Sequence, residues 1–214
     1  MRHKAVIFDM DGTILDTLDD LAGSVNHSLA LFGYPTRSRD EIRSFLGNGM
    51  IRLIHLSVPD GISKEQEEAV LNEHKSYYPM HSCDMTRPYD GIVDLFRELK
   101  NRGIKTAVVS NKSDANVKAL VSQFFNGLFD VSIGSTEGVA RKPAADMVNM
   151  ALERLGVSKE DAIYIGDSEV DLNTAKNSRL DMITVTWGFR DIDHLIQNGA
   201  TVFANTPAQI LDLL

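Results

Sequence analysis

The stretch Ala5-Val6-Ile7-Phe8-Asp9-Met10-Asp11-Gly12-Thr13 decides the fold of this chain, because four apolar residues run directly into acids, a glycine and a threonine. A short apolar run with polar flanks is typical of a fully buried strand in a parallel sheet. Acids that follow such a strand lie at the carboxyl edge of the sheet, where open α/β sheets bind ligands. Asp9 and Asp11 point to the same side of an extended backbone, so one should take up a proton or both should share a cation. The alternative, from these residues alone, is a strand with an ordinary Asp-Gly turn.

Composition limits what this motif can mean. The chain has 214 residues, 43% hydrophobic and 24% charged, which suits one globular domain or a domain with an insertion. The net charge of -8 argues against nucleic-acid or membrane partners, so an anionic substrate needs a locally positive site. The single cysteine, Cys83, fits a reducing compartment. We see neither a signal-peptide pattern nor an apolar run of membrane-spanning length, and we therefore expect a cytoplasmic protein.

Residues from Thr17 to about Thr86 show only helical spacing. The first apolar stripe, which Gly33 and Pro35 end, consists of Leu18, Leu21, Ala22, Val25, Leu29 and Phe32. Further helices are expected at Ser38–Leu46, Met50–Val58 and Ser63–Tyr78. The pattern predicts an inserted helical segment that separates the first strand from the rest of its sheet.

After Arg87 helical patterns alternate with short apolar runs. Helices are expected at Ile92–Asn101, Ala115–Phe124, Asp146–Leu155 and Asp171–Asn177. Strands are expected at Lys105–Val109, Phe129–Ile133, Ala162–Ile165, Met182–Val185 and Thr201–Phe203. Alternating strands and helices imply right-handed crossovers in a parallel sheet. The sequence thus predicts an α/β fold with a Rossmann-like, doubly wound core domain at 1–16 and 87–214, and an inserted α-helical cap domain at 17–86.

Two further strand ends carry residues that suit an anion. Ser110 and Asn111 end a predicted strand just before a helix, where free amides and the helix dipole favour negative charge. Alternatively, Ser110 and Asn111 only cap that helix. Lys142 precedes Pro143, which favours an extended backbone, and it is either part of the site or simply an exposed lysine.

A fourth strand end carries two acids. Gly166 and Asp167 follow an apolar run, and Asp167 and Asp171 would share a face of the helix that opens there. Carboxylates from separate loops suit Mg2+, which keeps several of its waters. The alternative is a capping box from Ser168 to Asp171 without a metal, and both readings can hold together.

These four motifs, in the order D-x-D-G-T, S-N, K-P and G-D-x-x-x-D, resemble those of the haloacid-dehalogenase-like hydrolase superfamily over the whole chain. One of its subclasses has an α-helical cap after the first strand. The resemblance implies that Asp9 is the nucleophile and Asp11 the general acid/base. It also implies that Ser110 binds the phosphoryl group with help from Asn111, and that Lys142 offsets negative charge.

The resemblance further implies a metal site. Mg2+ would be held by Asp9, by Asp167 and by the backbone carbonyl of Asp11, with Asp171 in the second shell of ligands. The chain departs from the family at Arg179, which stands where a glycine usually ends the helix. A left-handed arginine there would cost roughly 1 kcal/mol of stability without altering the chemistry.

The substrate is indicated less clearly. Gly47, Asn48 and Gly49 lie within the helical insertion and could form a loop that closes over the site, or a plain turn between helices. With the stretches 87–91 and 187–189, this loop resembles the phosphoglycolate phosphatase branch of the superfamily. Trp187 and Phe189 themselves are interpreted as core aromatics beside a turn.

We therefore expect a Mg2+-dependent phosphomonoester hydrolase that works through a phospho-aspartate on a small phosphorylated metabolite such as 2-phosphoglycolate. A sugar-phosphate phosphotransferase or mutase of the β-phosphoglucomutase type, or a pyrophosphatase, remains the alternative. A non-catalytic phosphate-binding module is disfavoured, because every charged position of the chemistry is filled. We expect a monomer or a homodimer.

Overall fold

A computed structural model describes residues 3–214, which divide into two compact units. The core unit comprises residues 3–15 and 88–214, and the helical unit comprises residues 16–87. Both boundaries fall within short strands, β2 (Leu15–Asp16) and β3 (Arg87–Pro88), which pair with each other. That the helical unit serves as a cap stays a prediction.

A six-stranded sheet runs through the core unit in the order β5-β4-β1-β6-β7-β8, and every neighbouring pair is parallel. Its strands are β1 (Ala5–Phe8), β4 (Lys105–Ser113), β5 (Val131–Ser135), β6 (Ala162–Gly166), β7 (Asp181–Val185) and β8 (Phe203–Ala204). The residues of β1 are fully buried between β4 and β6, as expected for a parallel strand covered on both faces. The predicted α/β class is confirmed, although β4 continues to Ser113 and β5 begins only at Val131.

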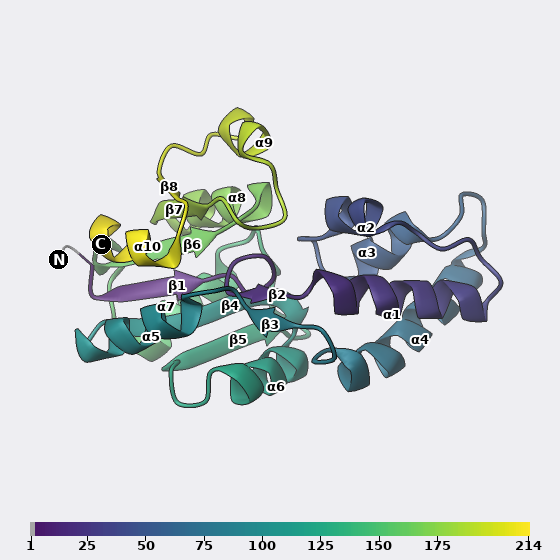
Figure 1. The fold of residues 1–214 in the computed structure, drawn as a ribbon, viewed down its shortest axis with the longest axis horizontal. Helices are drawn as coiled ribbons and strands as arrows, with labels where there is room; N and C mark the ends of the chain where they lie inside the picture. The colour runs from purple at the N-terminus through teal and green to yellow at the C-terminus, as the bar shows by residue number, and fades with distance from the viewer. Residues whose placement is uncertain (1–2) are drawn as a thin grey trace. The chain divides into compact units, whose positions relative to one another are not determined.

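Helices cover both faces of this sheet (Figure 1). One face packs against α5 (Ile92–Asn101), α6 (Asp114–Phe124) and α10 (Pro207–Leu213). The other face packs against α7 (Asp146–Leu155) and α8 (Glu169–Ser178). Because side chains alternate along a strand, Val6 and Phe8 join the first layer, while Ala5 and Ile7 join the second. Both faces are thus filled, and polar residues gather at the carboxyl edge.

The helical unit consists of α1 (Leu18–Leu31), α2 (Arg39–Phe45), α3 (Met50–Ser57) and α4 (Lys64–His81). Capping boxes at Ser38 and Ser63 begin α2 and α4, because each serine accepts a backbone N–H that the helix leaves unpaired. The buried carboxylate of Asp20 accepts hydrogen bonds from the backbone nitrogens of Met85 and Thr86, which ties the end of this unit to its first helix.

Three short elements of the core unit were not predicted, namely the 3-10 helix η1 (Lys159–Asp161) and the helices α9 (Ile192–Gln197) and α10. Arg179 adopts the left-handed conformation considered for it, with φ of 60° and ψ of 44° at the end of α8. Across residues 3–214, none of the helices combines the length and apolar character that a bilayer crossing requires.

Candidate active site

The predicted site residues of the core unit lie at the carboxyl ends of its strands. Asp9 directly follows β1, Ser110 and Asn111 lie in the last part of β4, and Asp167 directly follows β6. Lys142 comes from the loop between β5 and α7. Since the strands are parallel, these residues from distant parts of the sequence meet at one edge of the sheet.

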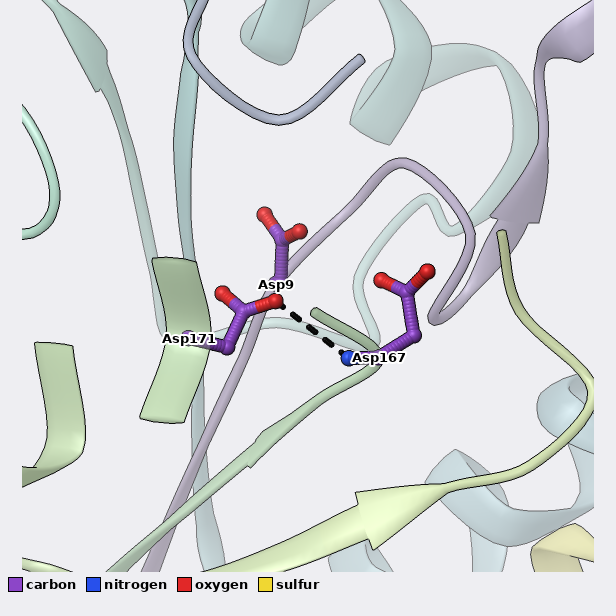
Figure 2. Close-up of side chains that lie close together, drawn as sticks. All are labelled: Asp9, Asp167 and Asp171. Atoms are coloured by element: carbon purple, nitrogen blue, oxygen red, sulfur yellow. Dashed lines mark hydrogen bonds between the residues drawn. The ribbon is translucent and has the colours of Figure 1, made fainter. Parts of the chain in front are cut away.

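Three carboxylates form a compact cluster at this edge. One oxygen from each of Asp9, Asp167 and Asp171 lies within 4.8 Å of the other two. Figure 2 shows the carboxylates of Asp9 and Asp167 extending to the same side, whereas that of Asp171 is turned toward the backbone nitrogen of Asp167, 3.3 Å away. Asp9 and Asp167 therefore present their oxygens to the same side, while Asp171 accepts a hydrogen bond from the neighbouring backbone.

Lys142 is the cation of this cluster. Its Nζ lies 2.6 Å from Asp9 Oδ1 and 2.8 Å from Asp171 Oδ1, and it donates to the Tyr164 hydroxyl at 3.1 Å. Only 4% of Lys142 is exposed. The alternative of an exposed, solvated lysine is therefore wrong: Lys142 is buried and paired with two acids, as a buried charge must be.

Asp171 supports this arrangement from the first turn of α8. The Oγ and the backbone nitrogen of Ser168 donate to Asp171 Oδ2, at 2.6 and 3.1 Å, and the Ser168 hydroxyl caps the helix in return. Asp171 Oδ1 accepts from Lys142 and from the hydroxyl of Tyr164. The capping box thus forms, and its acid also orients the lysine.

Asp167 is held tightly by the loops around it. Its Oδ1 accepts from the Thr13 hydroxyl at 3.0 Å, and its Oδ2 accepts from the backbone nitrogen of Phe189 at 2.7 Å. A Cβ on Gly12 or on Gly188 would collide with the Asp167 carboxylate. Gly12 also has a φ of 82°, which favours glycine. These glycines therefore leave the space that the acid occupies.

The pKa values of the charged groups in the cluster are shifted from their ordinary values. Burial and the charge of Asp171 raise the pKa of Asp9 well above its ordinary value, against the opposing effect of Lys142. Burial and Asp171 also raise the pKa of Asp167 to about 7. Burial alone would lower the pKa of Lys142, but Asp171 and Asp9 raise it well above its usual range. The ammonium thus stays charged, and ionised Asp9 and Asp167 carry negative charge that a cation would relieve.

The S-N motif does not cap the helix that follows it. Ser113 is the N-cap of α6 and accepts from the backbone nitrogen of Asn116, so the capping alternative for Ser110 and Asn111 is wrong. Ser110 is buried and its Oγ accepts from the backbone nitrogen of Lys112. The Asn111 amide donates to the carbonyl of Lys142 at 3.0 Å, which ties the two loops together. A phosphate-binding role for either residue stays a prediction.

Asp11 is paired with Lys112, a lysine that is not among the site residues predicted from the sequence. Lys112 Nζ lies 3.1 Å from Asp11 Oδ1, and the exposed fractions of these side chains are 7% and 20%. The signal was in the sequence: Lys112 ends the same motif as Ser110, and a lysine that follows a buried strand into an expected anion site is a candidate counter-charge. Tyr164 gave no such signal, because it lies inside the apolar run of β6.

Gly47, Asn48 and Gly49 lie in the helical unit, outside the unit that contains the other predicted site residues. They connect α2 and α3, and Gly49 is the N-cap of α3. Both glycines have positive φ values, 109° and 81°, which a residue with a Cβ rarely adopts. Their role in substrate binding stays a prediction.

The residues of the cluster fit a hard divalent cation. Asp9 and Asp167 come from separate loops and present carboxylate oxygens to the same side (Figure 2). Asp171 is already engaged by Lys142 and Ser168, which leaves it as a supporting group. A few carboxylates with room for water are how such cations are usually bound beside phosphates.

A buried cluster of three acids and a lysine at the carboxyl edge of a Rossmann-like sheet is the arrangement expected of an α/β enzyme. The family model described as haloacid dehalogenase-like hydrolase matches residues 6–185, a range that contains all four motifs. The chain belongs to the haloacid dehalogenase-like hydrolase family.

Known relatives place the chain within this family. It is 30% identical to phosphoglycolate phosphatase 1 of Pseudomonas aeruginosa over 217 residues, covering 99% of this chain and 77% of the relative. It is 27% identical to the phosphoglycolate phosphatase of Pseudomonas putida, covering 98% of this chain and 76% of that protein. A solved structure from Lactobacillus delbrueckii subsp. bulgaricus, assigned provisionally as a phosphoglycolate phosphatase, has a TM-score of 0.95 and 36% identity, covering 100% of this chain and 98% of that one. The chain is a phosphatase of the phosphoglycolate phosphatase-like branch.

Proposed function

We propose that this phosphatase is a Mg2+-dependent phosphomonoester hydrolase that acts on 2-phosphoglycolate or a closely similar small phosphorylated acid. The contact that carries the proposal is the buried pair of Lys142 and Asp9, in which a fixed ammonium lies 2.6 Å from a carboxylate at a strand end. The relatives named phosphoglycolate phosphatase, which match nearly the whole chain, support the choice of substrate.

Asp9 is the nucleophile in this proposal. Its carboxylate attacks phosphorus and the ester P–O bond breaks, while Asp11 gives a proton to the leaving oxygen. Asp11 then takes a proton from a water molecule that attacks the phospho-aspartate, which releases phosphate and restores Asp9. Ser110 and Asn111 donate hydrogen bonds to the phosphoryl oxygens, and Lys142 offsets the negative charge of nucleophile and phosphate together.

Asp9, Asp167 and the backbone carbonyl of Asp11 would hold Mg2+, and Asp171 would support them as a second-shell group. When bound, Mg2+ neutralises charge on the phosphoryl oxygens and lowers their repulsion from the nucleophile. Asp171 contributes by holding Lys142 in place, since its Oδ1 accepts from that ammonium. The neutralising charges are thereby in position before substrate arrives, which is the main contribution to phosphoryl transfer.

The leaving group distinguishes this proposal from its alternatives. A mutase of the β-phosphoglucomutase type would use the same Asp9 and Lys142 but pass the phosphoryl group to a sugar hydroxyl instead of water. A pyrophosphatase would release a second phosphate in place of an alcohol. The phosphatase relatives favour hydrolysis of a phosphomonoester.

A substrate panel tests this proposal. Phosphate release would be measured with Mg2+ on 2-phosphoglycolate, pyrophosphate and β-glucose 1-phosphate, the last with and without glucose 1,6-bisphosphate. We expect kcat/KM to be highest for 2-phosphoglycolate, and we expect the Asp9→Asn variant to release no phosphate, which excludes a contaminating phosphatase. Conversion of β-glucose 1-phosphate to glucose 6-phosphate, without hydrolysis of 2-phosphoglycolate, would overturn the proposal in favour of the mutase.

We also propose that the protein works in a reducing compartment, most simply the cytoplasm. The exposed free thiol of Cys83 favours this proposal. The oligomeric state, a monomer or a homodimer, stays a prediction that gel filtration with light scattering would decide.

A further inference from the structure

The loop that follows β7 contacts both segments that supply the proposed metal ligands, the D-x-D-G-T stretch and Asp167. The indole Nε1 of Trp187 donates to the carbonyl oxygen of Thr13 at 3.0 Å, across 174 positions of sequence. The backbone nitrogen of Phe189 donates to Asp167 Oδ2 at 2.7 Å. Thr13 in turn donates its hydroxyl to Asp167 Oδ1 at 3.0 Å. These three hydrogen bonds connect the loop, the D-x-D-G-T stretch and Asp167.

Gly188 brings this loop into direct contact with Asp167. A Cβ on Gly188 would collide with the Cβ and with Oδ2 of Asp167, and a Cβ on Gly12 would collide with the same carboxylate. Asp167 is thus enclosed by backbone from two loops, Gly12 on one and Gly188 on the other. This close backbone on two sides restricts the positions open to the Asp167 carboxylate.

Arg190 anchors the far end of the loop. Its guanidinium forms two hydrogen bonds to Glu169 at the start of α8, from Nε at 2.8 Å and from the second terminal nitrogen at 3.2 Å. Paired bonds of this kind fix direction as well as distance. The loop is therefore held at both ends, by Trp187 at the D-x-D-G-T stretch and by Arg190 at the helix that follows Asp167.

We propose that Trp187, Gly188 and Phe189 are positioning residues for the metal ion, and that they set its affinity by fixing the separation between Asp9 and Asp167. The inference rests on the proposed function, because it takes these two acids as ligands. The acids come from different loops, so their separation is only as constant as the contacts between those loops. Losing a group that orients a metal ligand typically costs about 10- to 100-fold in metal affinity.

Trp187→Phe tests the proposal most cleanly, because it keeps an aromatic ring against Tyr89 and removes the N–H that reaches Thr13. Thr186→Val is the matched control: its hydroxyl lies in the same loop but donates to Asn205 Oδ1 at 2.9 Å, away from the acids. Dissociation constants would be measured on EDTA-treated protein by calorimetry with MgCl2 and by electron paramagnetic resonance with MnCl2.

We expect Trp187→Phe to weaken both metals by about 10-fold, while Thr186→Val binds them as the wild type does. Most of the kcat of Trp187→Phe should return at saturating Mg2+, which a general loss of folding would not allow. Gly188→Ala should weaken binding further, because Asp167 must move to admit the new methyl group.

Wild-type affinity in a folded Trp187→Phe protein would overturn the inference, whether or not Gly188→Ala folds. A wild-type protein that binds neither metal would instead contradict the proposed function. The two failures are therefore distinguishable in the same set of titrations.

Discussion

The ammonium nitrogen of Lys112 lies 3.1 Å from Asp11 Oδ1, while that of Lys142 lies 2.6 Å from Asp9 Oδ1. Each acid of the D-x-D pair thus lies beside a different lysine, although Lys142 also pairs with Asp171. The pair of Asp11 and Lys112 is largely shielded from water, so it restrains the direction of the Asp11 carboxylate more than an exposed pair would. We expect this restraint to matter because, in the proposed mechanism, Asp11 must reach both the leaving oxygen and the attacking water.

Lys112→Met should lower kcat by about 10- to 100-fold with a smaller change in KM, because a misplaced acid/base is costly for the chemical step. Lys112→Arg should recover part of the loss, since it keeps a cation beside Asp11. Lys118→Met is a control: Lys118 also pairs with an aspartate, Asp114, but 62% of its side chain is exposed. Steady-state kinetics measure these changes. An unchanged kcat in Lys112→Met would show that Lys112 does not position Asp11 for catalysis.

Removing the metal should stop turnover. Without a cation, the carboxylates of Asp9, Asp167 and Asp171 repel a phosphate dianion, and Lys142 alone is shared between two of them. We expect EDTA to abolish phosphate release, added Mg2+ to restore it, and Mg2+ to raise the Tm of the metal-free protein. Full activity in metal-free buffer would be incompatible with this arrangement.

Asp167→Asn should stabilise the metal-free protein at pH 8. Burial, followed by the charge of Asp171, raises the pKa of Asp167 from 3.8 to about 7. The folded state therefore keeps a proton that the unfolded state loses, and this stabilisation, complete below pH 4, disappears as the pH rises through about 7. An asparagine stays neutral, accepts from the Phe189 nitrogen through its oxygen and can donate to the Thr13 hydroxyl.

We expect Asp167→Asn to gain roughly 1 to 3 kcal/mol at pH 8, or several degrees in Tm, and clearly less at pH 5. Thermal unfolding in EDTA at the two pH values measures this difference. Asp94→Asn makes the same change in formal charge on a side chain that is 80% exposed, and should show no such pH dependence. If Asp167→Asn destabilises the protein equally at both pH values, the hydrogen bonds of Asp167 contribute more to stability than its buried charge costs.

The Gly47 and Gly49 pair offers a test of substrate selection. Both residues have positive φ values, so replacing them with alanine should restrict the loop between α2 and α3. We expect Gly47→Ala with Gly49→Ala to change the ratio of kcat/KM for 2-phosphoglycolate to that for larger phosphomonoesters. Equal losses on every substrate would mean that the loop does not select the leaving group. Labelling of Asp9 by substrate should survive in either case.

The parts of the fold and site that sequence could predict are those encoded locally. Apolar runs that end in acid or glycine placed Asp9 and Asp167 at strand ends. The prediction that Asp167 and Asp171 share a helix face is wrong, because Asp167 precedes the N-cap of α8. Helix α8 begins at Glu169, because Ser168 caps it and Asp171 occupies the third helical position. The short helices α9 and α10 were not predicted from local patterns either.

What sequence could not predict depends on contacts between distant segments. The sequence predicts that Trp187 is a core aromatic, yet its indole N–H also donates to the carbonyl of Thr13, 174 positions away. Tyr164 lies within an apolar strand, and only the fold shows that its hydroxyl accepts from Lys142 and donates to Asp171. Such contacts follow from the order of strands in the sheet, which no short-range pattern specifies.

The central claim is that Asp9 carries the phosphoryl group during turnover, and acid-quenched labelling with radioactive 2-phosphoglycolate tests it most directly. Wild-type protein with Mg2+ should hold a label that hydroxylamine releases and that maps to the peptide containing Asp9. Asp9→Asn, shown to be folded by circular dichroism, should hold none and turn over no substrate. Near-normal turnover by folded Asp9→Asn, or a label mapped to another residue, would contradict the account.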